Sequence, residues 1–127
     1  MHENEIARQI VDAAFKIHST YGPGLLESAY EAMLVYELEK RGLRVVCQQP
    51  MALVYEDMRL DIGYRADLVV EDAVIVELKS VEAIAKVHFK QLLTYLRVSD
   101  KRLGLLINFG GEKIGSNTKR IANRLQD

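Results

Sequence analysis

Hydrophobic residues recur at helical spacing through the first forty positions of the chain. Isoleucine and alanine return every three or four residues, which predicts an amphipathic helix over about residues 4–19. A second stripe predicts a helix from about Pro23 to just before Gly42, because proline suits a first helical turn and glycine accepts the left-handed conformation that ends a helix. The first stripe consists of Ile6, Ile10, Ala13, Ala14 and Ile17.

After Gly42 the hydrophobic period changes to two, which indicates β-strands. Residues 45–55 predict a strand that is interrupted or bulged at 48–50 and lies near a sheet edge. A turn at 56–57 leads to a second strand and a turn at 71–72 to a third, over residues 73–79, so the three strands form an antiparallel meander. The second strand alternates polar residues with Leu60, Ile62, Tyr64, Ala66 and Leu68.

The remaining elements are a helix, a strand and a weakly helical tail. Residues 81–98 predict a third helix capped by Ser80, and residues 103–109 are almost all apolar, as is typical of a strand buried on both faces. The basic tail, residues 117–125, is predicted to be weakly helical. This order predicts one α/β (α+β) domain over residues 1–127, with helices flanking a central mixed β-sheet.

Composition changes this picture little. The 127 residues are 49% hydrophobic and 28% charged, which is typical of a globular domain. We expect no membrane contact, because no apolar run approaches the roughly 20 residues that span a bilayer. The single Cys47 has no partner for an internal disulfide, which favours the reducing cytoplasm, and we expect it to be a small core residue.

The net charge of -1 gives no general attraction to nucleic acid, so any such contact needs a local basic patch. Eight cations in the C-terminal half form either such a patch or scattered solubilising charge, and both interpretations stay open. They are Lys86, Lys90, Lys101, Arg102, Lys113, Lys119, Arg120 and Arg124.

The predicted strand over residues 73–79 carries two opposite charges on one face. Strand alternation places Glu77 and Lys79 together, and the turn at 71–72 folds Asp67 of the preceding strand beside Glu77. Ionised groups in apolar surroundings cost several kcal/mol unless they are paired, hydrated or bound to metal. Mg²⁺ is usually held by one or two carboxylates, and a nearby ammonium can orient a nucleophile and offset developing negative charge. The pattern therefore suits metal-assisted phosphodiester hydrolysis.

Two helical residues extend this candidate site. Gln91 lies on one stripe of the third helix with Tyr95, so it can point into the same cleft, and Glu27 interrupts the apolar face of the second helix as a third carboxylate. Each residue also has an ordinary interpretation. In that interpretation, Glu77 and Lys79 would form an ion pair on a solvated edge strand. Asp67 would be a solvated residue near a turn, and Gln91 would be a surface amide. Glu27 is then a first-turn acid that favours the helix dipole.

Together these residues resemble the PD-(D/E)XK nuclease superfamily. Its pattern is an aspartate at the end of one strand followed by Glu-X-Lys on the next, which corresponds to Asp67 and residues 77–79. Residues 91–95 resemble the Gln-X-X-X-Tyr motif of the RecB-like branch. Residues 24–30, Gly-Leu-Leu-Glu-Ser-Ala-Tyr, resemble the motif that names the GxxExxY protein family, and the similarity extends over about residues 10–124. Ala66 stands where the superfamily name has proline.

The resemblance implies a restriction-endonuclease-like core and a nuclease, that is, a hydrolase that acts on the phosphodiester bonds of DNA or RNA. It implies Asp67, Glu77 and Glu27 as ligands of Mg²⁺ or Mn²⁺, Lys79 as the catalytic lysine, and Gln91 and Glu27 as further active-site residues. The alternative is a catalytically inactive nuclease-fold module for binding or assembly. A homodimer would suit a small domain that acts on a long duplex, because two-fold symmetry matches its two strands.

Overall fold

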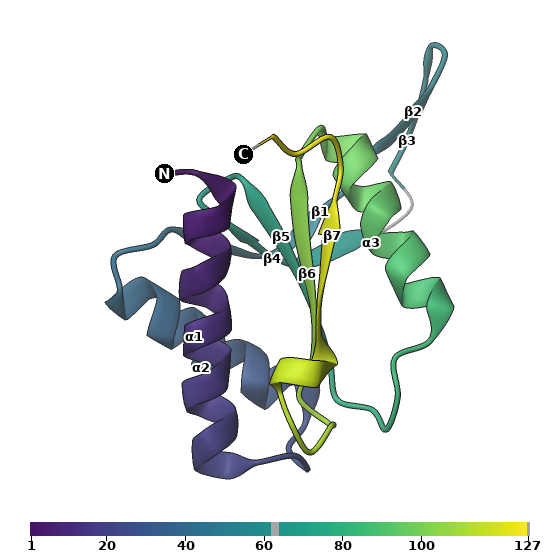
Figure 1. The fold of residues 1–127 in the computed structure, drawn as a ribbon. Helices are drawn as coiled ribbons and strands as arrows, with labels where there is room; N and C mark the ends of the chain where they lie inside the picture. The colour runs from purple at the N-terminus through teal and green to yellow at the C-terminus, as the bar shows by residue number, and fades with distance from the viewer. Residues whose placement is uncertain (62–63, 127) are drawn as a thin grey trace.

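The computed structural model describes residues 1–61 and 64–126 (Figure 1). Ile62, predicted to lie in the second strand, is outside the described residues. The elements in chain order are α1 (Glu3–Tyr21), α2 (Glu27–Lys40), β1 (Val45–Pro50), β2 (Leu53–Tyr55), β3 (Met58–Leu60), β4 (Arg65–Val70), β5 (Val74–Lys79), α3 (Lys86–Ser99), β6 (Leu103–Asn108), the 3₁₀ turn η1 (Gly115–Asn117) and β7 (Thr118–Ala122).

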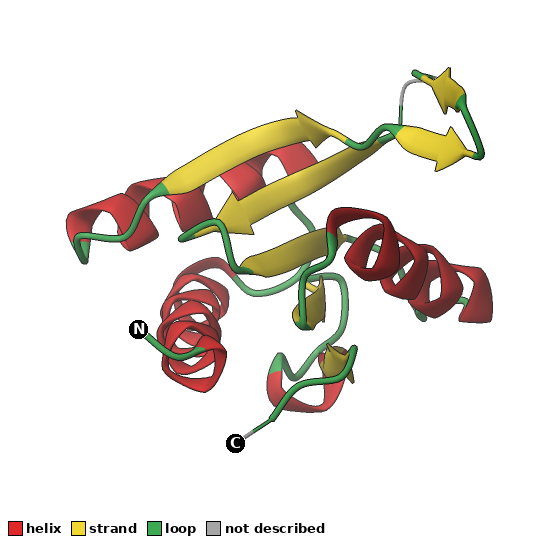
Figure 2. Ribbon diagram, turned by 90° about the horizontal axis from the view of Figure 1, so that it is seen from above, coloured by secondary structure: helices red, strands yellow, loops and turns green. Residues whose placement is uncertain are grey.

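The main sheet is mixed, as the sequence predicts. Its five strands lie in the order β1-β4-β5-β6-β7, so β1 is an edge strand. β1, β4 and β5 form an antiparallel meander, whereas β6 runs parallel to β5 and β7 antiparallel to β6. β2 and β3 pair only with each other in the part of the chain that the structure describes, and this hairpin stands away from the main sheet (Figure 2).

Helices cover both faces of this sheet. α1 and α2 lie on one face and α3 on the other (Figure 2). The alternation along β5 decides which residue meets which helix: Val74, Val76 and Leu78 pack in the core cluster of α1 and α2, whereas Ile75 packs in that of α3. Glu77 follows the alternation of Ile75. The layer order is therefore helix, sheet, helix, which is the predicted restriction-endonuclease-like arrangement.

The two N-terminal helices are held together by a predicted apolar stripe and an unpredicted ion cluster. Every residue of the α1 stripe is buried, which confirms the helical prediction. Glu37 of α2 is buried and accepts ion pairs from Lys16, Lys40 and Arg41. Hydrogen bonds from Lys16 and Lys40 lower the pKa of the Glu37 carboxyl to about 2. The charged groups therefore tie α1 to α2 beside the apolar contact.

The contact between α3 and the sheet depends on Gly104 of β6. A Cβ atom at this position would lie 2.9 Å from side-chain atoms of Leu92, so only glycine lets the helix approach the strand this closely. All six residues of β6 are buried, which confirms the predicted two-sided strand. No helix among the described residues has both the length and the apolar character needed to cross a membrane.

Four element predictions are wrong. The predicted second strand, from Leu60 to Leu68, is divided between β3 and β4, which belong to different sheets. The tail forms strand β7 rather than a helix, because β6 offers it an open edge from Leu103 to Ile107. α2 begins at Glu27 rather than near Pro23. α3 begins at Lys86, since the segment before it is bent and is held in place by Asn108, whose side chain bonds the backbone N–H and C=O of Val81.

Two single-residue predictions are also corrected. The Ser80 hydroxyl does not cap α3 but donates to the Leu25 carbonyl oxygen at 2.9 Å. Cys47 is exposed on the edge strand β1 rather than buried in the core, because β1 has a neighbouring strand on one side only.

Candidate active site

The strands β4 and β5 separate at Asp67. Their paired register runs from Val70 and Val74 to Leu68 and Val76, and side chains take over beyond it. Asp67 Oδ2 accepts a hydrogen bond from the Leu78 N–H at 2.8 Å, and the Asp67 N–H donates to Glu77 Oε1 at 3.4 Å. Side-chain hydrogen bonds of Asp67 and Glu77 thus take the place of backbone hydrogen bonds between the two strands. The two carboxyl groups lie side by side there, as the sequence predicts.

Glu77 lies in the middle of the sheet and is only 6% exposed. Burial, together with the negative charge of Asp67 and a hydrogen bond between the two carboxyls, raises the pKa of Glu77 to about 9. Lys79 lowers this pKa, so its ammonium lies within electrostatic reach of Glu77. The interpretation of an ion pair on a solvated edge strand is therefore wrong, because β5 is a central strand and the carboxyl is buried.

A small cavity of about 210 Å³ opens on the α2 side of this carboxyl pair. We call it the acidic pocket. Gln48 crosses it, because its amide nitrogen donates to Glu31 Oε1 at 2.8 Å and to Asp67 Oδ1 at 3.4 Å. Gln48 has a φ of 51°, and the pairing of β1 with β4 is interrupted at this residue, opposite Asp67, with the same register on either side. The pocket is lined by Glu27, Ser28, Glu31, Gln48, Asp67 and Leu78.

The loop before α2 positions Glu27 at the mouth of the acidic pocket. Gly24 has a φ of 114°, which L side chains rarely adopt. Tyr30 is fully buried; its hydroxyl donates to the Gly22 carbonyl oxygen at 2.5 Å and accepts from the Leu25 N–H at 3.2 Å. The Ser80 hydroxyl fastens Leu25 to the end of β5, as described above. The glycine and the tyrosine therefore shape the turn from which α2 starts, and Glu27 is the first helical residue.

A second cavity of about 210 Å³ lies on the α3 side, and we call it the aromatic pocket. Tyr95 is 6% exposed, and its ring meets that of Tyr64 edge-on, with the centroids 6.4 Å apart. Burial raises the pKa of Tyr95, and the nearby negative charge of Glu77 raises it further. The aromatic pocket therefore adjoins the carboxyl pair from the opposite side. It is lined by Met51, Leu53, Tyr64, Gln91, Thr94 and Tyr95.

The structure brings together most of the predicted site residues but divides them between two sides. Asp67 contacts Glu77, and Glu27 shares the acidic pocket with Asp67. Gln91 is exposed and lines the aromatic pocket instead, where it makes no hydrogen bond to any other described residue. Lys79 is half-buried, and its ammonium likewise makes no hydrogen bond or ion pair within the described part of the chain, whereas its carbonyl oxygen accepts from the Phe109 N–H.

Sequence reasoning missed three residues of these pockets. Glu31 lies one helical turn after Glu27, a spacing that could have signalled a shared face. Gln48 lies where the strand is predicted to be interrupted or bulged, but that prediction does not reveal which side chain turns inward. Tyr64 was assigned to an alternating strand and lies just outside β4.

The carboxyl pair fits a hard divalent cation. Among residues 1–61 and 64–126, no three histidine, cysteine or acidic side chains cluster closely enough to hold a metal ion by themselves. Mg²⁺ needs fewer protein ligands, because it is usually held by one or two carboxylates and takes its other ligands from water and phosphate. Asp67 and Glu77 place two carboxyl groups in contact. Their mutual repulsion when both are ionised is relieved by either a bound proton or a bound cation. The residues present therefore suit Mg²⁺.

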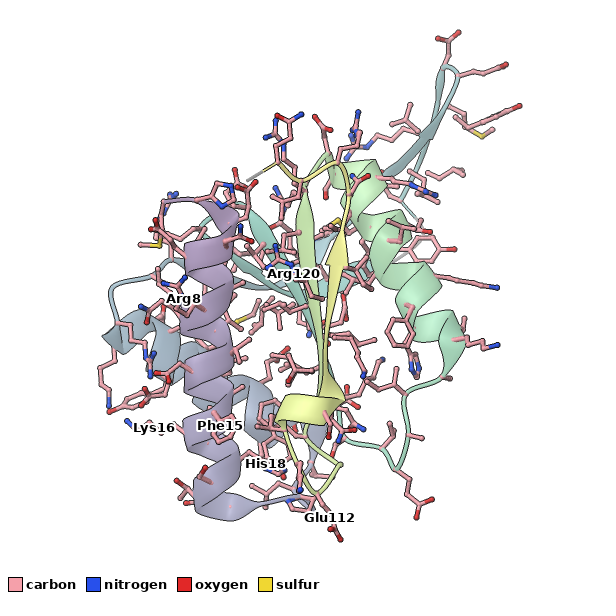
Figure 3. All side chains as sticks on the ribbon, viewed as in Figure 1. Arg8, Phe15, Lys16, His18, Glu112 and Arg120 are labelled. Carbon is pink, nitrogen blue, oxygen red and sulfur yellow. The ribbon has the colours of Figure 1, made fainter. Side chains whose placement is uncertain are left out.

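A larger cavity of about 560 Å³ lies elsewhere, between α1 and the β6–β7 edge of the sheet. Figure 3 shows Arg120 of β7 between that strand and α1, where its guanidinium donates to Asn4. The cavity has an apolar floor that includes Ala7, Val11 and Leu105, and neither acid of the carboxyl pair lines it. Size alone therefore does not mark the candidate site in this molecule.

The eight cations of the C-terminal half do not gather in one place. Lys101 and Arg102 precede β6, whose first residue pairs with Val74, so they lie at the end of β5 opposite to Lys79. Lys101 pairs with Asp72, and Arg124 pairs with Asp100. The interpretation of scattered charge therefore describes these residues better than that of one basic patch.

Comparison with known families gives one match. A model of the PD-(D/E)XK nuclease superfamily matches residues 4–121. No match was found among curated proteins or among solved structures. The matched range includes both pockets and the carboxyl pair between them.

Proposed function

Because this chain belongs to the PD-(D/E)XK nuclease superfamily, we propose that it is a nuclease that hydrolyses phosphodiester bonds of nucleic acid with a bound Mg²⁺ or Mn²⁺ ion. The observation that carries this proposal is the contact between Asp67 and Glu77 at the point where β4 and β5 separate. Within the superfamily we assign the chain to the GxxExxY group, on the motif residues Gly24, Glu27 and Tyr30 and the turn that they build.

Asp67 and Glu77 would hold the metal ion, with Glu27 as a further acid across the acidic pocket. When bound, the ion lowers the pKa of a coordinated water and polarises the phosphate. Glu77 is buried, and its carboxyl group lies against that of Asp67. Both carboxyl groups are therefore in position before a metal ion binds. Gln48 contributes by holding Glu31 and Asp67 in one arrangement.

Lys79 is the candidate catalytic lysine. It follows Glu77 by two residues on the same face of β5, and its ammonium is not committed to an ion pair with any described residue. An ammonium in this place orients the attacking water and offsets the negative charge that develops on the phosphate. Gln91 lies farther from the acids, in the aromatic pocket, and we assign it a supporting part in substrate contact.

We also propose that residues 1–127 work as one domain in the cytoplasm. The exposed thiol of Cys47 suits a reducing compartment, where it stays unpaired. Its pKa is raised by burial and by the acids Glu31 and Glu39, which keeps the thiol protonated and unreactive.

Cleavage by the purified full chain tests the proposal. Single- and double-stranded DNA and RNA are incubated with Mg²⁺ or Mn²⁺, and product is followed by gel and by release of a fluorophore. We expect Lys79→Ala to reduce cleavage by about 10²- to 10³-fold and to keep the circular dichroism spectrum and Tm of the native chain. Lys86→Ala, which removes an exposed lysine from the start of α3, is the matched control and should cleave normally.

Two results would overturn the proposal. Cleavage that survives Lys79→Ala unchanged identifies a contaminating nuclease. Failure to cleave any of the four substrates, with Mn²⁺ binding retained, identifies a catalytically inactive binding or assembly module. Metal binding itself is measured as an increase of Tm with ion concentration, which Asp67→Ala should abolish.

A further inference from the structure

The aromatic pocket has a lining that the hydrolysis of a phosphodiester bond does not require. The acidic pocket carries the acids that suit metal and phosphate, whereas the side chains that line the aromatic pocket are apolar, aromatic or neutral. Tyr64 exposes 40% of its surface, and its ring is held by the edge-on contact with Tyr95. Next to the rings, Gln91 offers both a donor and an acceptor that no other described residue uses.

We infer that the aromatic pocket binds one unpaired nucleobase of the substrate, so that the enzyme acts on single-stranded nucleic acid or on unpaired ends. This inference rests on the proposed nuclease function. Single strands are recognised by stacking of bases on aromatic side chains and by hydrogen bonds to the base edges. Tyr64 supplies the stacking surface and Gln91 the hydrogen-bonding group. A base that is paired inside a duplex cannot enter such a cavity without leaving its stack.

The size of the cavity supports a single flat ring system. Its volume of about 210 Å³ lies below the roughly 300–1,000 Å³ of pockets that enclose drug-sized ligands. Whole nucleotides therefore do not fit inside it. The sugar and phosphate would remain outside, on the side where Tyr95 adjoins Glu77.

The charge distribution supports the same occupant. Proteins that grip a nucleic-acid backbone do so with a basic surface, but this chain has a net charge of -1 and its cations are dispersed. Three acids, Glu27, Glu31 and Asp67, also line the pocket next to the carboxyl pair. Affinity for a polyanion therefore has to come from its uncharged part, which is the base.

Binding without cleavage tests this inference separately from the nuclease function. The full chain carrying Glu77→Gln is titrated in Mg²⁺ against fluorescein-labelled oligonucleotides of about 12 nucleotides, and anisotropy is recorded. Four ligands are compared: single-stranded DNA, single-stranded RNA, the DNA duplex, and an abasic DNA strand that keeps every phosphate. We expect the single strands to bind at least about ten-fold more tightly than the duplex or the abasic strand.

Variants of Tyr64 locate the contact. In the same background, Tyr64→Ala should weaken single-strand binding by about five- to a hundred-fold, whereas Tyr64→Phe, which keeps the stacking ring, should bind like the parent. Tyr36→Ala is the matched control, because Tyr36 is 65% exposed on α2 and lies outside both pockets. The slope of log affinity against log salt concentration should stay between about -0.7 and about -1.4, as for contact of a single strand with one or two phosphates.

The outcomes separate the two proposals. Equal affinity for the abasic and the normal strand, or an unchanged affinity in Tyr64→Ala, overturns the base pocket and leaves the nuclease in place if the native chain cleaves. Tyr64-dependent binding by a chain that cleaves nothing supports the base pocket and overturns the nuclease. A difference between the DNA and RNA strands tells which sugar the enzyme prefers.

Discussion

The acidic pocket and the aromatic pocket have the same volume, about 210 Å³, and flank the same pair of carboxyls, yet they share no lining residue. Carboxylates and the Gln48 amide line the first, whereas rings, aliphatic chains and the neutral groups of Gln91 and Thr94 line the second. The difference follows from the layers, because α2 contributes its acids to one pocket and α3 its neutral side chains to the other. The two faces of one sheet thus give the carboxyl pair a charged side and an uncharged side.

The two pockets also depend on different forces. The acidic pocket is shaped by hydrogen bonds, those of Gln48 to two acids and those of Tyr30 to the loop before α2. The aromatic pocket is shaped by packing, because Met51 and Tyr95 belong to the core cluster beneath α3. Charge and pH should therefore act on the first pocket and side-chain volume on the second.

The largest expected effect is loss of chemistry with retention of base binding. Asp67→Asn removes the charge of one acid of the carboxyl pair, and we expect cleavage to fall by about 10³-fold while single-strand affinity changes by less than about two-fold. The measurement is kcat/KM on a fluorogenic oligonucleotide beside an anisotropy titration. Asp57→Asn at the tip of the β2–β3 hairpin is the control and should cleave normally. Loss of both properties together would contradict the division into two pockets.

The next effect is a dependence of stability on pH in the absence of metal. Since the pKa of Glu77 rises from an ordinary 4.5 to about 9 in the folded chain, the unfolded chain loses this proton first as pH rises. The stabilisation that Glu77 contributes to the free energy of unfolding is therefore fully present below about pH 4.5. It decreases between about pH 4.5 and about pH 9, with a slope of at most about 1.4 kcal/mol per pH unit, and stays constant at higher pH.

Urea denaturation in EDTA between about pH 6 and pH 8 measures this slope. Glu77→Gln should flatten it, because the amide does not titrate, whereas Glu39→Gln, which removes an exposed acid of α2, should leave it unchanged. A slope that survives Glu77→Gln would assign the effect to another group.

A smaller effect is expected from the loop that carries Glu27. Tyr30→Phe leaves the Gly22 carbonyl and the Leu25 N–H without their buried partner, which should cost about 1–3 kcal/mol of stability. We expect Tm to fall by several degrees and cleavage to fall with it, since the start of α2 loses its anchor. Tyr36→Phe removes an exposed hydroxyl from the same helix and should change neither. An equal loss of cleavage in Tyr36→Phe would contradict a specific role of this loop in positioning Glu27.

The smallest effect concerns Glu31, at the rim of the acidic pocket. Glu31→Gln keeps an oxygen that accepts the hydrogen bond of Gln48 but removes one negative charge. We expect metal affinity, followed by Mn²⁺-dependent thermal stabilisation, to fall by about two- to five-fold. Single-strand binding at the aromatic pocket should stay within error. An unchanged metal affinity would mean that Glu31 lies outside the electrostatic reach of the ion.

Periodicity was enough to predict the elements whose partners are local or whose burial is complete. The stripe of α1 is apolar because one face of the helix is buried, and the run of β6 is apolar because the whole strand is buried. The structure confirms both. β7 could not be predicted in the same way, because its charged residues become a strand only by pairing with β6. The start of α3 could not be predicted for a similar reason: the side chain of Asn108, far along the chain, bonds the backbone of Val81 and holds a bend there.

For the candidate site, spacing was enough to bring Asp67 beside Glu77, since a short turn joins their strands. It was not enough to place Gln91, because the helical stripe shows which residues share a face but not where the helix docks. The position of the Gln48 side chain depends on a positive φ where the pairing of β1 is interrupted, and this backbone conformation follows from contacts across three elements. The roles assigned to Lys79 and the acids remain predictions that the variants above decide.

The β2–β3 hairpin leaves the sheet between two strands that define the site, and its base is closed. The Met51 N–H donates to the Tyr64 carbonyl oxygen at 2.7 Å, just beyond the pairing of Pro50 with Arg65. Residues inserted at the tip therefore lengthen an arm without disturbing the acids behind its base. The outer end of this arm, from Tyr55 to Met58, is thus a natural graft point where evolution or an engineer can add new contacts, while Leu53 at its base keeps its place in the aromatic pocket.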